Sequence, residues 1–166
     1  MQKILVSSCL LGEKVRYDGG DCAQDGLIRL WQEQGRIVPF CPESEGGLST
    51  PRPPAEIERG YNAEDVLRGA ARVLRQDGGD VTAAFVNGAE RALACCWKHR
   101  IKIAILKEGS PSCGVACVHD GTFSGRKKPG QGITARLLSR HGISVFHEGQ
   151  LEMAARRLAE LEHECG

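Results

Sequence analysis

The chain has 166 residues and a formal net charge of +1, from 22 basic and 21 acidic residues. This length suits a single α/β domain over 1–166 with one hydrophobic core. Because the charges balance, the protein has no strong positive electrostatic field that would attract a polyanionic partner, and this argues against RNA as the substrate. No stretch approaches the roughly 20 apolar residues of a membrane span, and the apolar run before Cys9 is too short for a signal peptide, so no membrane association is expected.

The first half of the chain predicts two buried strands with a helix between them. Lys3–Ser8 and Arg36–Phe40 are short apolar runs typical of parallel strands. Gly26–Gln34 has the apolar spacing of a short helix that ends at Gly35. The stretch 43–56, with its glycines and prolines, predicts a long loop without secondary structure, and such loops are usually functional.

The second half predicts further strands and helices. Asp65–Gln76 favours a hairpin over a helix, because two apolar pairs flank a glycine. Asp80–His99 carries one apolar stripe with helical spacing, and Ile101–Leu106 is a buried strand. Val115–Gly132 predicts a hairpin that turns at Asp120-Gly121.

Three more elements complete the predicted fold: a helix over Thr134–His141, a strand over Ile143–Phe146 and a closing helix over Leu151–Leu161. The alternation of strands and helices favours an open, mostly parallel sheet with helices on both faces. The expected class is therefore α/β, Rossmann-like or flavodoxin-like.

Three cysteines follow the ends of three predicted strands: Cys9, Cys41 and Cys113. Because the carboxyl ends of parallel strands meet at one edge of a sheet, we expect the three thiols to converge. The eight cysteines are too sparse for a disulfide scaffold. A reducing compartment, the cytoplasm, is expected instead, with thiols that bind metal or act in catalysis.

Three thiolates without an obvious fourth suggest a metal site with one position open. Structural zinc takes four protein ligands, whereas a catalytic metal keeps a position for water or substrate. Thiolates also select iron–sulfur clusters and Cu(I). The spacing alone leaves zinc and an iron–sulfur cluster as alternatives.

Polar residues accompany these cysteines. Glu43 lies two residues beyond Cys41, and Ser110 and Ser112 flank Pro111 beside Cys113. The ordinary interpretation is a surface carboxylate and two turn-forming serines. Beside a metal site, Glu43 is a candidate general acid or base and the serines are candidates for orienting a substrate.

Other candidates are weaker. Cys96 lies on the predicted apolar stripe, and a core role is expected for it and for Cys95. Cys117, four residues after Cys113, is a weak candidate for a shared ligand, and Cys22 is as consistent with a ligand as with a structural residue. Loop surface is favoured for Arg16 and Asp18, and a solvated face for Arg126-Lys127-Lys128 unless the substrate carries a phosphate. Cys165, near the carboxyl terminus, carries little information.

Taken together, several blocks resemble the bacterial thiouracil desulfidase family over nearly the whole chain, in the family's order. Each block alone is weak evidence for the family, but the blocks together are specific for it. The blocks are Ser8–Gly12, Val15–Gly19, Cys41-Pro42-Glu43, Gly46–Leu48 with Thr50–Pro54, Ser110–Gly114 and Asp120–Phe123.

This resemblance implies a [4Fe–4S] cluster held by Cys9, Cys41 and Cys113, with one open iron that takes the sulfur of a thiolated pyrimidine. It implies non-redox desulfuration of 2- or 4-thiouracil-type compounds (base, nucleoside or nucleotide) to the oxo form and hydrosulfide. The matching catalytic positions are Glu43, Ser110 and Ser112. Glu45 stands where the family more often has an apolar residue, so Glu43 inherits the carboxylate role.

Two other functions remain open from the residues. A zinc-dependent hydrolase or deaminase would use the same three cysteines. A non-catalytic iron–sulfur sensor or nucleotide-binding module would hold a cluster and turn nothing over. The oligomeric state does not follow from the sequence.

Overall fold

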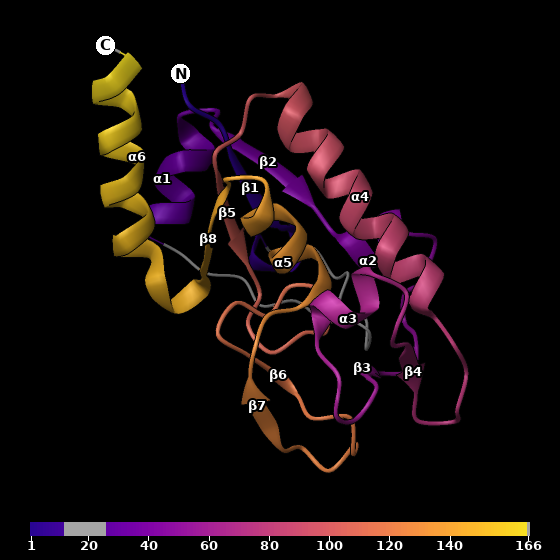
Figure 1. Cartoon of the computed structure of the whole chain (residues 1–166). Helices are drawn as coiled ribbons and strands as arrows, with labels where there is room; N and C mark the ends of the chain where they lie inside the picture. Colours follow the sequence, from indigo (N-terminus) through magenta and orange to yellow (C-terminus); the bar gives the residue numbers. More distant parts are fainter. Residues whose placement is uncertain (12–25, 166) are drawn as a thin grey trace.

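The computed structural model describes residues 1–11 and 26–165, and a four-stranded parallel sheet lies at the centre of this part (Figure 1). The strand order is β2-β1-β5-β8, and every pairing is parallel. The predicted open parallel sheet is therefore confirmed. Its strands are β1 (Ile4–Ser7), β2 (Ile37–Phe40), β5 (Ile103–Leu106) and β8 (Ser144–His147).

Helices cover both faces of the sheet, as predicted: α1 and α6 lie on one face and α3, α4 and α5 on the other (Figure 1). Along β1, Leu5 belongs to the core beneath α4, whereas Ile4 and Val6 belong to the core beneath α1 and α6. Successive strand side chains point to opposite faces, so a strand covered on both faces is apolar throughout. The helices are α1 (Leu27–Glu33), α3 (Ala63–Leu67), α4 (Thr82–Lys98), α5 (Ile133–Arg140) and α6 (Leu151–Cys165).

The region between β2 and α4 differs from the sequence-based expectation. The predicted loop 43–56 overlaps the short helix α2 (Pro42–Glu45) and contains most of the strand β3 (Ala55–Ile57). The hairpin predicted over 65–76 was wrong. Its first part belongs to α3, which is fixed by a capping box between Asn62 and Asp65. Its second part is β4 (Val73–Arg75), which pairs along its length with β3. Leu74 also forms one antiparallel bridge with Asp80, beyond the predicted span.

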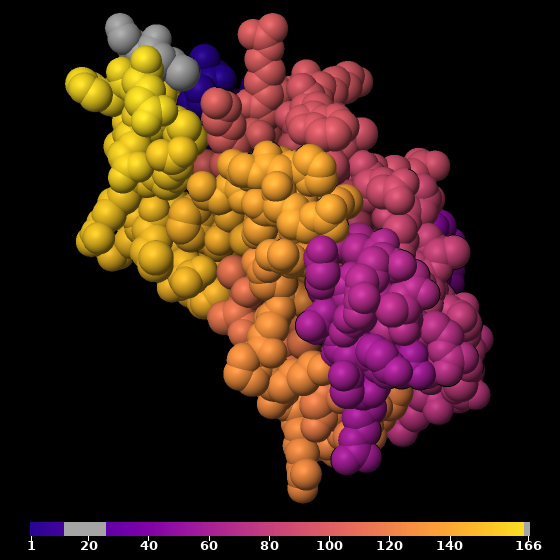
Figure 2. All heavy atoms as spheres, viewed as in Figure 1, coloured from indigo at the N-terminus to yellow at the C-terminus, as the bar shows by residue number. Residues whose placement is uncertain are grey.

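A second small ribbon follows β5. The hairpin predicted over 115–132 is confirmed as β6 (Cys117–His119) paired with β7 (Lys127–Pro129). It lies beside the segment around α3, as Figure 2 shows in its lower half, and Lys128 Nζ donates to the Tyr61 carbonyl oxygen at 2.5 Å. Two 3₁₀ turns, η1 (Ser8–Leu11) and η2 (Glu148–Gln150), follow β1 and β8.

The topology defines where a ligand can bind. The chain moves from β1 to β2 on one side and later to β5 on the other, so β1 and β5 flank a topological switch point. In open α/β sheets, ligands bind outside the carboxyl ends of the strands at such a point. Across the described residues, no helix is long and apolar enough to cross a membrane.

Candidate functional site

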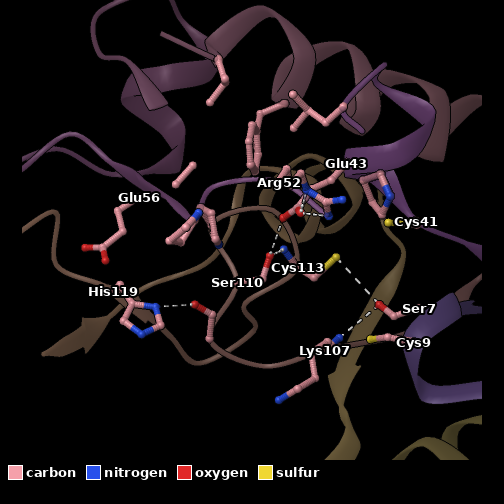
Figure 3. Close-up of a pocket in the computed structure, with 18 of the residues that line it drawn as sticks. Ser7, Cys9, Cys41, Glu43, Arg52, Glu56, Lys107, Ser110, Cys113 and His119 are labelled. Carbon is pink, nitrogen blue, oxygen red and sulfur yellow. Dashed lines mark hydrogen bonds and ion pairs between the residues drawn. The ribbon is translucent and has the colours of Figure 1, made fainter. Parts of the chain in front are cut away.

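A cavity of about 360 Å³ opens at the carboxyl ends of β1, β2 and β5 (Figure 3). One part of its wall is apolar and includes Phe40, Leu48 and Phe85. Polar and charged groups line the remainder. A small organic ligand suits this mixture, because apolar walls bury most of its surface and a few polar groups orient it.

The three strand-end cysteines all line this cavity, and Figure 3 shows their thiols on one side of it. Cys9 lies in η1, Cys41 is the N-cap residue of α2, and Cys113 lies in the turn after β5. Cys9 and Cys113 are buried and Cys41 is half-buried. The expected convergence is present, although the roles of the three thiols stay predictions.

Close packing of α2 against α4 positions Cys41 and Glu43. A Cβ atom at Gly88 of α4 would collide with the carbonyl oxygen of Pro42, and one at Gly46 would collide with the carbonyl oxygen of Ala84. The two glycines therefore allow a backbone approach that larger residues would block. This contact brings the first turn of α2 to the edge of the sheet.

Glu43 extends into the cavity and is held on both carboxylate oxygens. Arg52 forms an ion pair with Oε2, with its Nε at 2.9 Å, and the hydroxyl of Ser110 donates to Oε1 at 3.3 Å. The Arg52 side chain is only 7% exposed, and its Nη1 donates to the Ser49 carbonyl and to Thr50 Oγ1. The carboxylate is therefore fixed in orientation by a nearly buried guanidinium. Glu45 is exposed and is not among the described residues that line the cavity.

The two serines of the turn have different positions. Ser110 lines the cavity, and its Oγ accepts the backbone N–H groups of Ser112 and Cys113 at 3.0 and 3.1 Å. Ser112 is fully buried, and its Oγ lies 2.9 Å from Thr134 Oγ1 at the start of α5. The structure brings Ser110 to the cavity and does not bring Ser112 there. Ser112 is therefore packed against the start of α5, and its predicted part in catalysis stays a prediction.

Glu108 organises the turn that carries Ser110 and Cys113, and sequence reasoning missed it. Its Oε1 accepts backbone N–H groups from Val115 at 2.7 Å, Ala116 at 3.2 Å and Cys117 at 3.3 Å, and from Gly109 at 3.1 Å. Burial raises the pKa of Glu108, but these hydrogen bonds outweigh burial and the pKa is lowered. No sequence pattern indicates this role, because the donors are backbone groups.

The far side of the cavity carries Glu56, His119 and Lys127. Glu56 is 7% exposed, and its Oε1 accepts the N–H groups of Gly121 and Phe123, which fixes the tip of the β6–β7 hairpin. His119 Nδ1 lies 3.1 Å from the Gly109 carbonyl oxygen. Of the basic run, Lys127 lines the cavity, so the expected solvated face holds for only part of it.

The other cysteines lie away from the cavity where they are described. Cys96 is fully buried on α4, as predicted, and burial raises the pKa of its thiol to about 12. Cys95 is half-buried, and Cys117 in β6 is not among the described cavity residues. Cys22, Arg16, Asp18 and the side chain of Cys165 lie outside the described residues.

The positions of the thiols bear on whether they could hold a single metal ion. Zinc would need its sulfur ligands within about 2.3 Å of a common point, and among the described residues no three His, Cys, Asp or Glu side chains are placed to hold a single ion. Burial, together with the charges of Glu43 and Cys41, raises the pKa of Cys113, so its thiol is a poor free nucleophile. The first observation gives no mononuclear metal site among the described residues, and the second argues against covalent catalysis by the free Cys113 thiol.

Comparisons with known proteins agree with this site. A family model described as 2-thiouracil desulfurase matches residues 4–150. YbbK, an uncharacterized protein of Bacillus subtilis (strain 168), is 46% identical over 148 residues, which cover 89% of this chain and 97% of YbbK. A solved structure of the [4Fe-4S]-dependent thiouracil desulfidase TudS is 46% identical, with a TM-score of 0.87, and the match covers 96% of this chain and 99% of TudS.

Proposed function

Because this chain belongs to the 2-thiouracil desulfurase family, we propose that it converts thiolated pyrimidines of the 2- or 4-thiouracil type to their oxo forms. The reaction is a hydrolysis: the carbon–sulfur bond breaks, water supplies the new oxygen, and hydrosulfide and a proton leave. No electron donor is consumed. The observation that carries the proposal is the meeting of three strand-end thiols and a fixed carboxylate in one cavity.

Cys9, Cys41 and Cys113 are the residues that would hold a [4Fe–4S] cluster, the cofactor in the name of the TudS structure. The donor set suits this group, since thiolates are its usual ligands and the three thiols line one side of the cavity. Each thiolate of a cluster binds a different iron, so three sulfur atoms need not converge on one point. When bound, the cluster would supply an open iron that acts as a Lewis acid toward the substrate's sulfur.

Glu43 is the proposed general base. Its carboxylate would take a proton from the water that attacks the carbon bearing sulfur, and would later return it to the leaving group or to solvent. Arg52 and Ser110 hold the two oxygens, so the carboxylate keeps one orientation before substrate enters. Such preorganisation reduces the entropy cost of reaching the reactive geometry.

Ser110 has a defined part in this arrangement. Because its Oγ accepts two backbone N–H groups, its single proton is available for Glu43. It links the Cys113 turn to the catalytic carboxylate and keeps the two at a fixed spacing. The apolar wall formed by Phe40, Leu48 and Phe85 would hold the pyrimidine ring and limit the entry of water.

The test is hydrosulfide release from 2-thiouracil and 4-thiouracil by protein purified without oxygen, measured together with iron and acid-labile sulfide. Glu43→Gln should keep the cluster and lose at least about 10²-fold in turnover, the usual contribution of a general base. Glu45→Gln is the matched control, since Glu45 lies on the same helix and is exposed; it should behave like the wild type.

Three results would contradict the proposal. Zinc without labile sulfide would support the zinc hydrolase. A cluster-loaded protein that releases no hydrosulfide from either compound would support the sensor. An unchanged rate in Glu43→Gln would remove Glu43 from the mechanism.

A further inference from the structure

Ser7, the last residue of β1, occupies a position that the proposed chemistry has not used. It is 4% exposed and lines the cavity at the crevice between β1 and β5. Its Oγ accepts the backbone N–H of Lys107, the first residue after β5, at 3.1 Å. The same hydroxyl donates to Cys113 Sγ at 3.8 Å (Figure 3).

The direction of this hydrogen bond is set by the two strands. A hydroxyl has one proton, and the Lys107 N–H is itself a donor, so the Ser7 proton is free to point at the sulfur. The pairing of β1 with β5 runs to Val6 and Ile105, directly before this contact. Ser7 is therefore held by the most buried part of the sheet, and its proton is aimed before any ligand binds.

We infer that Ser7 is a positioning residue whose hydroxyl donates a hydrogen bond to the Cys113 thiolate when that thiolate binds the cluster. The inference rests on the proposed function. Hydrogen bonds to ligand sulfurs withdraw negative charge from them and tune iron–sulfur potentials. Partners of this kind also orient the ligands, and their loss typically costs about 10–100-fold in metal affinity.

Two consequences follow for the cluster. With the hydroxyl present, Cys113 donates less charge to its iron, so the reduction potential is higher than without it. The thiolate also keeps one orientation, which slows its exchange off the iron. Ser7 would thus tune and retain the cluster without contacting the substrate's reacting atoms.

The experiment compares cluster-loaded wild type, Ser7→Ala and Ser7→Thr without substrate. The readouts are the reduction potential and the rate of iron loss to a chelator. Ser7→Ala should shift the potential to more negative values and lose iron about tenfold faster, whereas Ser7→Thr, which keeps the hydroxyl, should stay close to wild type. A third variant, Ser7→Val, serves as a further control. Threonine and valine have nearly the same shape and differ in the hydroxyl, so the comparison of Ser7→Thr with Ser7→Val tests the hydroxyl even if Ser7→Ala destabilises the fold.

The outcomes separate this inference from the proposed function. Wild-type protein that takes up no iron and sulfide overturns both. Wild-type protein that holds a cluster, with Ser7→Ala and Ser7→Val unchanged in potential and in iron loss, overturns the role of Ser7 alone. A loss shared equally by Ser7→Thr and Ser7→Val would show that shape and not the hydroxyl matters, which also refutes it.

Discussion

Replacement of Glu108 by glutamine tests how the turn carrying Ser110 and Cys113 is held. The Glu108 side chain is 17% exposed, and its carboxylate accepts four backbone N–H groups: those of Gly109, Val115 and Cys117 on Oε1, and that of Ala116 shared between Oε1 and Oε2. Glutamine is almost the same shape and can place its amide oxygen where Oε1 lies. The substitution therefore removes the charge and keeps most of the geometry.

The expected cost can be worked out from these bonds. A hydrogen bond to a charged group contributes about 1.5–3 kcal/mol, against about 0.5–1.5 kcal/mol for a neutral one. Four donors that share one carboxylate do not contribute additively, so we expect the free energy of opening this turn to fall by about 1–2 kcal/mol. The opening equilibrium of the turn should then increase by about 5–30-fold.

Native-state amide hydrogen exchange measures this opening at individual residues. In Glu108→Gln, the amides of Val115, Ala116 and Cys117 should exchange about 5–30-fold faster. The amides of Gly121 and Phe123, which Glu56 holds in the same hairpin, serve as an internal control and should not change. Glu152→Gln, an exposed position on α6, is the matched variant. Unchanged exchange at 115–117 would refute the role of Glu108.

The remaining predictions concern the proposed catalytic carboxylate of Glu43, the packing of the core and the pH dependence of stability. Arg52→Lys should lower hydrosulfide release about tenfold with iron content unchanged, because an ammonium replaces the guanidinium fork on Glu43; equal turnover would contradict this orienting role. Cys96→Ala should cost about 1–2 kcal/mol in unfolding free energy through a small cavity, and a matching loss of cluster would be the contrary result. The hydrogen bonds lower the pKa of Glu108, so its stabilisation is present above pH 4.5 and lost as pH falls through the lowered pKa. In iron-free protein, exchange protection at 115–117 should decline in acid for wild type and stay flatter for Glu108→Gln; parallel profiles would argue against this.

The central sheet was predictable because its strands carry a strong local signal. A strand such as Ile103–Leu106, buried on both faces, must be apolar at every position, and few other elements are so short and so uniformly apolar. Three cysteines at the ends of such strands then had to meet at one edge. That inference needed only the parallel direction of the strands.

The errors fall where the structure depends on partners far along the chain. β4 pairs with β3, and Ile57 lies opposite Val73, with both side chains in the core cluster that also holds residues of α4. No local pattern distinguishes this pairing from a hairpin over 65–76. Ser112 illustrates a second limit: it follows the same turn as Ser110, but the approach of α5 turns its hydroxyl toward Thr134.

Arg52 and Glu108 were missed for a third reason, since their partners cannot be seen in the sequence. The Arg52–Glu43 pair depends on how the chain from 46 to 54 folds back over α2, and Glu108 binds backbone groups that any residue carries. The block Thr50–Pro54 contained Arg52, but nothing in its spacing connected it to Glu43. The sheet could thus be predicted from local sequence patterns, whereas the side-chain contacts in the cavity depend on tertiary structure.

The most direct test of the account is the iron and acid-labile sulfide content of oxygen-free protein and of its cysteine variants. Wild type and Cys117→Ser should each hold about four iron and four sulfide per chain, while Cys9→Ser, Cys41→Ser and Cys113→Ser should each lose the cluster and the release of hydrosulfide together. A wild type that stays iron-free after reconstitution, or a Cys113→Ser variant that keeps a full cluster, would contradict the claim that these three thiols hold it.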